Sequence, residues 1–270
     1  MGRLSFPKRS SVEAGPPPPR LSVVIPAYNE ADRIERTLRS VLSYLRRQSF
    51  VSEVLVVDDG SDDGTVDAVA RCICRTTAVK VIRSPENRGK GWAIKEGMLA
   101  ASGEFRLFMD ADNSAAVEHW DAVAPLLEAG IDVVVGSRFA YSSRIHVAQP
   151  WARRLLGQVY RGVVRLGFSL PLTDTQAGFK VFSCRAAEHV FARAKIERWA
   201  FDVEILLIAQ CVGFRTAEVA LDWHDDGRSR MSILRACQMG WDLLKLRMML
   251  RSYMARGACA PGMRAPPGSG

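Results

Sequence analysis

The sequence predicts an α/β protein whose core is a parallel β-sheet with helices on both faces. Two observations predict this fold. Short, strongly apolar runs recur through the first half of the chain, and segments of helical composition separate them. Strands that are apolar throughout, rather than alternating with polar residues, are typical of a parallel sheet buried on both sides.

In chain order, the predicted strands are LSVVIP (21–26), EVLVVD (53–58), VKVIRS (79–84), EFRLFM (104–109) and DVVVGS (132–137). Valine, isoleucine and phenylalanine dominate these runs, and such residues favour a pleated, buried strand. The segments that predict helices are 30–46, 63–75, 90–101 and 116–129. The sequence shows no internal repeat.

Composition and charge limit the function. The chain has 270 residues, 48% of them hydrophobic, which is ample for one large domain or one domain with an appendage. Its formal net charge of +8 points to an anionic partner: a nucleic acid, a nucleotide or a membrane surface. The six cysteines form no CxxC pair and the four histidines are dispersed, so a zinc site is not expected. Any metal would be held by carboxylates, which favours Mg²⁺ or Mn²⁺.

The chain divides into predicted parts: a disordered, basic and proline-rich arm (1–20), one folded domain (21–230), an amphipathic helix (231–254) and a flexible tail (255–270). No apolar stretch approaches the roughly 18–20 residues that span a bilayer, and the first residues lack the apolar core of a secretory signal. Scattered free cysteines suit a reducing cytosol. We therefore expect a cytoplasmic protein without a spanning helix.

Polar side chains follow every predicted strand. These groups are YNE (28–30), DDGS (58–61), NRGK (87–90), DAD (110–112) and SR (137–138). In open α/β sheets, ligands bind outside the carboxyl ends of the strands. Turns alone would not require polar groups after all five strands. We therefore predict a ligand site at this edge of the sheet.

The stretch RLFMDADNS (106–114) ends an apolar run in two carboxylates one residue apart. In an extended backbone, residues i and i+2 point to the same side, so Asp110 and Asp112 converge. Two nearby anions repel unless a positive group lies between them. Taken alone, the motif also fits a cap on a helix beginning near Ser114. It loosely matches the DxDx[TS] of haloacid-dehalogenase phosphatases, but those carry it on their first strand.

Taken together, the motifs resemble a known family. LSVVIPAYNEADRIERTL, VLVVDDGSDDGT, NRGKGWAIKEGM, FMDAD and GSR resemble the GT-A glycosyltransferases of the large inverting family that includes polyprenyl-phosphate sugar synthases. In the second half, DTQAGFKVF (174–182), ERWAFDVEILLIAQ (197–210) and EVALDWHDDGRSRMSILRACQMGWDLLKLR (218–247) are similar to dolichyl-phosphate β-glucosyltransferases. The resemblance implies the GT-A fold, a Rossmann-like, mostly parallel sheet with flanking helices.

The resemblance also implies a function: transfer of a hexose, glucose from UDP-glucose, to a polyprenyl or dolichyl phosphate with inversion. The residues implied to bind the nucleotide are Pro26, Tyr28, Glu30, Asp58, Asp59, Lys90 and Asp110. Either Asp58 or Asp59 would accept the imide N–H of uracil. Asp110 and Asp112 match the DxD motif that holds Mg²⁺ or Mn²⁺ on the donor diphosphate, where the ion neutralises the leaving group.

A polyprenyl phosphate is largely dianionic near neutral pH, because phosphate monoesters have a second pKa of about 6. It can attack the sugar directly, so the protein mainly has to hold two anionic groups together. The implied acceptor-binding residues are Arg138, Arg153, Gln176, Trp199 and Arg230, and the implied catalytic residues are Asp110, Asp112, Asp202 and Arg138. Asp202 is expected to face the sugar or an arginine, and Glu204 to cap or pair. Core packing is an equal alternative for Trp199.

Residues 151–168 predict an amphipathic helix. Its apolar arc holds Trp151, Leu155, Val159, Val163 and Leu166, with arginines opposite. This pattern is typical of an interfacial helix attracted to anionic lipid, and the segment 231–254 repeats it more weakly. The alternative is a helix packed on the sheet with a basic outer face. We expect a peripheral protein on the cytoplasmic face of a membrane, bound directly or through a membrane-protein partner.

Other functions stay open. A related enzyme would use GDP-mannose, although Ser114 stands where mannosyl relatives have a glutamine. A catalytically silent sugar-nucleotide-binding or scaffold protein would not need the DAD, GSR and FDVE motifs together. Nucleic-acid binding fits poorly, because the basic residues lack interleaved aromatic residues. The chain departs from the family in placing Arg230 where a lysine is usual, and in lacking the usual N-terminal membrane anchor.

Overall fold

The structure, a computed structural model, describes residues 18–73, 79–138, 151–224 and 240–249. Several predictions therefore lie outside the described residues. They concern residues 1–17 of the predicted arm, the tail 255–270, residue Arg230, and the parts 231–239 and 250–254 of the predicted C-terminal helix. The side chain of Arg153 also lies outside the described part.

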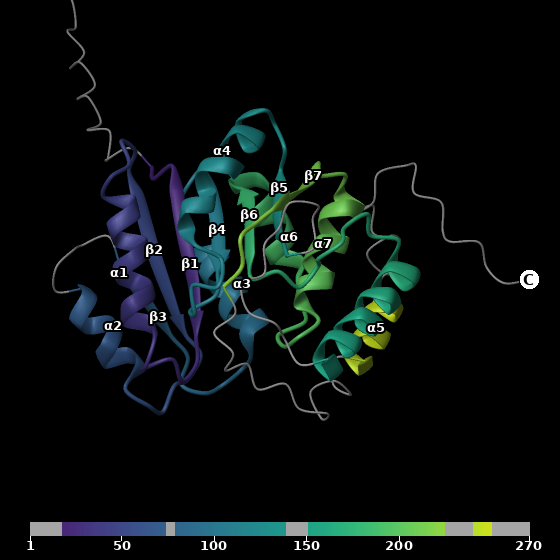
Figure 1. The fold of residues 1–270 in the computed structure, drawn as a ribbon, viewed down its shortest axis with the longest axis horizontal. Helices are drawn as coiled ribbons and strands as arrows, with labels where there is room; N and C mark the ends of the chain where they lie inside the picture. The colour runs from purple at the N-terminus through teal and green to yellow at the C-terminus, as the bar shows by residue number, and fades with distance from the viewer. Residues whose placement is uncertain (1–17, 74–78, 139–150, 225–239, 250–270) are drawn as a thin grey trace, which may run out of the picture.

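A mixed sheet organises the described chain (Figure 1). Its seven strands have the spatial order β3-β2-β1-β4-β6-β5-β7. They are β1 (Leu21–Ala27), β2 (Ser52–Asp58), β3 (Val79–Arg83), β4 (Phe105–Met109), β5 (Val133–Ser137), β6 (Phe179–Ser183) and β7 (Thr216–Ala220). All pairings are parallel except those of β6, which runs antiparallel to both β4 and β5.

Alternate residues of each central strand enter two separate cores, as the period of two in a strand requires. Val23 and Ile25 pack in one core, whereas Val24 packs in the other. The first core is covered by α1 (Ile34–Leu45), α2 (Thr65–Ile73), the 3-10 turn η1 (Val117–His119) and α4 (Trp120–Glu128). The second is covered by α3 (Lys90–Ala100), α5 (Trp151–Phe168), α6 (Cys184–Arg193), α7 (Phe201–Val212) and the helical residues 240–249. The predicted sheet with helices on both faces is confirmed, and it is mostly rather than entirely parallel because β6 runs antiparallel to its neighbours.

The five predicted strands are confirmed to within one residue at each end, but the sequence prediction missed β6 and β7. Every residue of β7 (TAEVA) is only half-buried, so this strand lacks the apolar run that identified the other strands. Strand β6 (FKVFS) is as long as β3, β4 and β5, so its length does not explain the omission. The omission matters because β6 lies between β4 and β5 in the sheet. Without β6, these two strands, which are consecutive among the predicted ones, would be expected to pair with each other.

Glu53 ties together the amino ends of several strands. It is 5% exposed, and its carboxylate accepts hydrogen bonds from the Ser22 hydroxyl (2.7 Å), the Ser102 amide and hydroxyl (2.7 Å each) and Lys80 Nζ (2.8 Å). Burial alone would raise the pKa of Glu53, but the hydrogen bonds, led by that from Lys80, lower it from 4.5 to about 2. Glu53 is therefore an ionised structural anchor at the end of the sheet opposite the predicted site.

We expect Glu53→Gln to lower the free energy of unfolding at pH 7 by about 1–3 kcal/mol, because it leaves buried donors poorly satisfied. The folded-state pKa of Glu53 lies below its unfolded value. Its contribution is therefore complete above about pH 4.5 and is lost as the pH falls toward about 2. Urea unfolding of both proteins between pH 7 and pH 3 should show their difference shrinking with acid. Glu104→Gln, at an exposed position near the same end of the sheet, is the control and should change stability little. A difference that grows with acid would contradict the assignment.

Candidate active site

The strand order brings the predicted polar groups to one edge. In the register of the sheet, Ala27 at the end of β1 lies beside Asp58 at the end of β2, and Val24 lies beside Phe108 of β4. Tyr28 and Asp110 therefore follow neighbouring strands. As predicted from the sequence, the carboxyl ends of β1, β2 and β4 deliver polar side chains to a common region.

Asp110 and Asp112 lie next to a partly buried ammonium group. Lys90 Nζ, at the start of α3, donates a hydrogen bond to Asp110 Oδ1 at 2.5 Å. Burial alone would lower the pKa of Lys90, but the carboxylates of Asp110, Asp202 and Asp112 raise it above its ordinary value. Part of the positive charge that the two aspartates require is thus supplied by Lys90.

The two carboxylates still suit a divalent cation. Burial, followed by the charge of Asp110, raises the pKa of Asp112, and a cation bound between the two carboxylates would oppose both effects. Among the described residues, no three His, Cys, Asp or Glu side chains gather closely enough to hold a metal ion. The donor set fits a hard ion that takes two carboxylates from the protein and its other oxygens from a ligand or water.

Gly178 allows β6 to approach Asp110. The Asp110 amide donates to the carbonyl oxygen of Gly178 at 3.1 Å, and a Cβ added at Gly178 would overlap the Asp110 carboxylate. The residue that precedes β6 must therefore lack a side chain. Gly178 lies within the DTQAGFKVF motif, but the motif alone did not predict this role for it.

Asp202 lies in the first turn of α7 and is 6% exposed. It accepts a hydrogen bond from Lys180 Nζ at 2.5 Å, whereas the sequence predicted that it would face the sugar or an arginine. Burial raises the pKa of Asp202 despite the opposing charges of Lys180 and Lys90. Glu204 accepts hydrogen bonds from the amides of Lys195 and Ile196 at 2.8–3.0 Å, so it holds the connection between α6 and α7 rather than capping a helix.

Arg138 pairs with a carboxylate that the sequence analysis did not assign. Its Nε and Nη2 donate to the two oxygens of Asp174 at 2.7 and 2.9 Å, and its guanidinium lies 5.1 Å from the Trp223 ring centroid. Burial would raise the pKa of Asp174, but the hydrogen bonds and charge of Arg138 lower it below its usual range. Glu218 accepts the Asp174 amide at 3.0 Å. The side chain of Arg138 keeps 20% of its surface exposed.

The carboxylates of Asp58 and Asp59 differ in the hydrogen bonds that they already accept. Both oxygens of Asp59 accept backbone amides, from Arg88 at 2.9 Å and Gly89 at 2.8 Å, so Asp59 holds the loop before α3. Asp58 Oδ1 accepts the Ser61 amide at 3.3 Å. Arg83 Nε lies 3.1 Å from Asp58 Oδ2, but no hydrogen bond with suitable geometry reaches this buried oxygen. Of the two candidates for the uracil imide, Asp58 therefore has the more available acceptor.

Comparison with known proteins decides the family. The sequence profile of glycosyl transferase family 2 matches residues 22–191. The chain belongs to glycosyl transferase family 2. This glycosyltransferase is 36% identical over 252 residues to the dolichyl-phosphate β-glucosyltransferase of Homo sapiens, covering 86% of this chain and 76% of the relative. It is 35% identical to the enzyme of that name from Drosophila melanogaster, covering 84% and 74%.

Solved structures confirm the GT-A fold of this family 2 glycosyltransferase. Glucosyl-3-phosphoglycerate synthase from Mycobacterium tuberculosis, crystallised with Mn²⁺, UDP and glucosyl-3-phosphoglycerate, has a TM-score of 0.57 at 21% identity, covering 89% of this chain and 80% of that one. A mannosyltransferase from Pyrobaculum calidifontis with GDP-mannose and Mn²⁺ has a TM-score of 0.58 at 22% identity, covering 92% and 66%. At these identities the likeness concerns the fold alone.

The other predicted site residues of the glycosyltransferase lie around this edge. Glu30 pairs with Arg33, and its pKa is raised first by burial, with Asp112 and Asp110 adding to the rise. Tyr28 is 45% exposed, whereas Pro26 is buried in β1.

The predicted acceptor residues that the structure describes lie in the second half of the chain. Trp199 is 36% exposed, so the alternative that it packs in the core is wrong. Gln176 is partly buried in the segment between Asp174 and Gly178.

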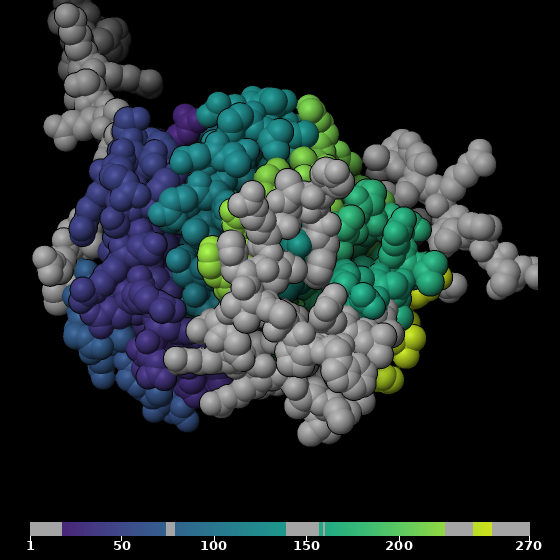
Figure 2. Space-filling model, viewed as in Figure 1, coloured from purple at the N-terminus to yellow at the C-terminus, as the bar shows by residue number. Residues whose placement is uncertain are grey.

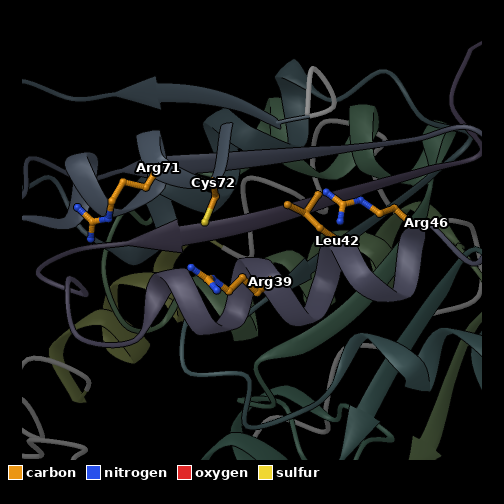
Figure 3. Close-up of a pocket in the computed structure, with 5 residues that line it drawn as sticks. All are labelled: Arg39, Leu42, Arg46, Arg71 and Cys72. Carbon is orange, nitrogen blue, oxygen red and sulfur yellow. The ribbon is translucent and has the colours of Figure 1, made fainter. Parts of the chain in front are cut away.

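A cavity of about 250 Å³ lies elsewhere on the glycosyltransferase, between α1 and α2 (Figure 3). It is lined by Arg39, Leu42, Arg46, Arg71 and Cys72. Arg46 and Arg71 lie at the C-terminal ends of these helices, whereas the polar strand ends lie near the helix N-termini. The cavity is therefore separate from the candidate active site.

Proposed function

We propose that this family 2 glycosyltransferase transfers glucose from UDP-glucose to a polyprenyl phosphate such as dolichyl phosphate, with inversion at the anomeric carbon. The observation that supports this best is the similarity to dolichyl-phosphate β-glucosyltransferases, which at 30–36% identity extends over both halves of the chain. It therefore includes the second-half segments that bring Gly178, Lys180 and Asp202 to the Asp110 carboxylate.

The nucleotide is held at the ends of the first strands. Asp58 accepts the uracil imide N–H with Oδ2, which carries no hydrogen bond and lies beside Arg83, while Asp59 fixes the loop that precedes Lys90. Asp110 and Asp112 would hold a divalent cation, which neutralises charge on the leaving diphosphate when bound. Lys90 adds a second positive group at the same place.

The acceptor phosphate is itself the nucleophile. One of its oxygens forms the new bond to the anomeric carbon from the face opposite the diphosphate, as the bond to the UDP oxygen breaks. The acceptor is already ionised near neutral pH, so no protein base has to remove a proton. The protein positions two anions that repel each other. Arg138, partly exposed and anchored to Asp174, is placed to attract the incoming phosphate.

The proposal is tested by incubating the purified protein with UDP-glucose or GDP-mannose, Mg²⁺ or Mn²⁺ and a short polyprenyl phosphate, followed by mass spectrometry of the lipid. We expect a lipid product carrying one hexose from UDP-glucose. Product from GDP-mannose alone would establish the mannosyl alternative. An absence of product from both donors, with UDP still bound, would support the silent binding protein.

The lipid acceptor requires contact with a membrane, and we propose that one flank of the molecule provides it. Within the described residues, no helix has the length and apolar character to cross a bilayer. Helix α5 and residues 240–249 lie side by side, joined by a hydrogen bond from Arg247 to the Gly167 carbonyl at 2.5 Å (Figure 1). Figure 2 shows them on the flank opposite α1 and α2.

This flank, formed by α5 and residues 240–249, exposes large apolar side chains among basic ones. The exposed apolar residues are Val163 (49%), Leu166 (86%), Trp241 (59%), Leu244 (53%) and Met248 (62%). Arg165, Lys245 and Arg247 are exposed on the same helices. Apolar side chains enter the headgroup region while basic ones attract anionic lipid, so the surface suits a peripheral protein on the cytoplasmic face of a membrane.

We expect the wild-type protein to sediment with vesicles that contain phosphatidylserine and to be partly released by high salt, because each basic residue contributes about 1 kcal/mol near an anionic surface. Leu166→Asp/Leu244→Asp should remove this binding with the circular dichroism spectrum unchanged. Leu99→Asp is the matched control, since Leu99 is 39% exposed on α3, away from this flank, and it should bind like wild type. If the wild-type protein ignores vesicles, a membrane-protein partner must bring it to the lipid.

A further inference from the structure

Lys180 is a cation enclosed within the sheet. It is 0% exposed and lies in β6 between Phe108 of β4 and Val135 of β5. Its Nζ donates hydrogen bonds to Asp202 Oδ1 at 2.5 Å and to the Ala177 carbonyl oxygen at 2.7 Å. A buried ammonium group costs free energy unless protein groups replace its water. These two acceptors supply that replacement, and both belong to the candidate active site.

The two hydrogen bonds join segments that are distant in sequence. Ala177 immediately precedes Gly178, whose carbonyl accepts the Asp110 amide and whose missing side chain makes room for the Asp110 carboxylate. Asp202 lies in the first turn of α7. The Lys180 ammonium group therefore holds both the backbone next to Asp110 and a carboxylate at the start of α7.

Lys180 also reduces the negative charge that Lys90 has to neutralise. Lys90 interacts electrostatically with both Asp110 and Asp202 while its hydrogen bond goes to Asp110. Lys180 and Lys90 are the cations that act most strongly on Asp202, and Arg138 acts on it as well. If Lys180 were neutral, Asp202 would be a buried carboxylate that has lost its hydrogen-bonded cation, and Lys90 would be attracted away from Asp110 toward it.

We propose that Lys180 is a positioning residue for sugar transfer. By holding Asp202 and the Ala177–Gly178 backbone, it keeps Asp110 and Asp202 in place. Lys90 is then able to keep its hydrogen bond to Asp110. It need not touch the substrate. The inference rests on the proposed function, since transfer is the activity that it would support.

The test is a double-mutant cycle of Lys180→Met, Asp202→Asn and the combined variant. We expect each single variant to lower kcat by roughly 100-fold, with the Kd for UDP in Mg²⁺ changed less than about threefold by calorimetry. The combined variant should be no slower than the slower single variant, because the two residues act as one unit. The proposal would be overturned if the loss of kcat in the combined variant equals the product of the two single losses. It would also be overturned if Lys180→Met folds and keeps the wild-type kcat.

Arg106→Met is the matched control. Arg106 is another buried cation of the sheet, 3% exposed in β4, and pairs with Glu188 at 3.0 Å away from the carboxyl edge. Its loss should lower stability and leave kcat unchanged. This outcome separates a general effect of removing a buried charge from an effect on the active site.

Amide hydrogen exchange gives a readout that does not depend on the reaction. We expect residues 174–178 to exchange at least about tenfold faster in the combined variant than in Asp202→Asn, because only the former lacks the bond to Ala177. This comparison holds even if Lys180→Met alone does not fold. Equal exchange would overturn the positioning role. If wild type transfers no glucose while the exchange difference is present, the proposed function fails and the positioning role stands.

Discussion

Replacement of Asp112 by asparagine is expected to lower the rate of glucose transfer by roughly 10²–10³-fold, the range seen when one group that stabilises a developing charge is removed. Asparagine keeps the shape of the side chain and removes a charge that a divalent ion needs. The variant should be at least as stable as wild type, because burial and the repulsion of Asp110 already raise the pKa of Asp112. A loss of function without a loss of stability marks a residue that serves the reaction.

The measurement combines transfer rates with thermal unfolding. Asp110→Asn should also stop transfer, and excess EDTA should stop the wild-type enzyme, with activity restored by Mg²⁺ or Mn²⁺. Asp67→Asn, at an exposed position on α2, is the control and should change neither quantity. Wild-type transfer that continues unchanged in EDTA would remove the metal from the mechanism.

Gly178→Ala is expected to lower transfer about 100-fold, although it adds only one methyl group. That carbon overlaps the Asp110 carboxylate, so either the carboxylate or the start of β6 has to move. A displacement of about 1 Å in a group that positions the reactants costs on the order of 10²-fold in rate. The free energy of unfolding should fall by about 1–3 kcal/mol, the usual effect of overpacking.

Gly162→Ala in α5 is the comparison for this second prediction. A Cβ added there meets no atom within 4 Å, so the variant should keep its activity and gain slightly in stability. Transfer rates at saturating UDP-glucose, with folding checked by circular dichroism, distinguish the two glycines. Full activity in a folded Gly178→Ala would show that the contact between β6 and Asp110 is not needed.

The first half of the site could be predicted from the sequence because its signals are local. Each of β1 to β5 is a compact apolar run, and each is followed within a few residues by its polar groups. These patterns involve only residues that are close together in the sequence. The period of two in a strand does not account for the approach of Asp110 and Asp112, because β4 ends at Met109 and the Asn113 amide donates to the Asp110 carbonyl oxygen in a turn.

The pairings in the site could not be predicted in this way. Lys90 with Asp110, Arg138 with Asp174 and Lys180 with Asp202 each join residues at least 20 positions apart. Two of the three pairs depend on β6 or on the segment that leads into it, and no periodicity indicated where that strand enters the sheet. The same omission explains why Lys180 was not among the groups that Asp202 was expected to face, which were the sugar or an arginine.

The position of β6 also has a consequence for synthesis of the chain on the ribosome. Strand β5 hydrogen-bonds only with β6 and β7 among the described strands, and both are made after it. About 40 residues separate β5 from β6 and about 80 separate it from β7, which at about 5–20 residues per second means a wait of roughly 2–16 s. During that wait the strand DVVVGS is without either partner, and the finished β4 lacks one neighbour. Nascent chains halted between residues 140 and 175 should therefore bind chaperones more strongly than chains released after residue 224.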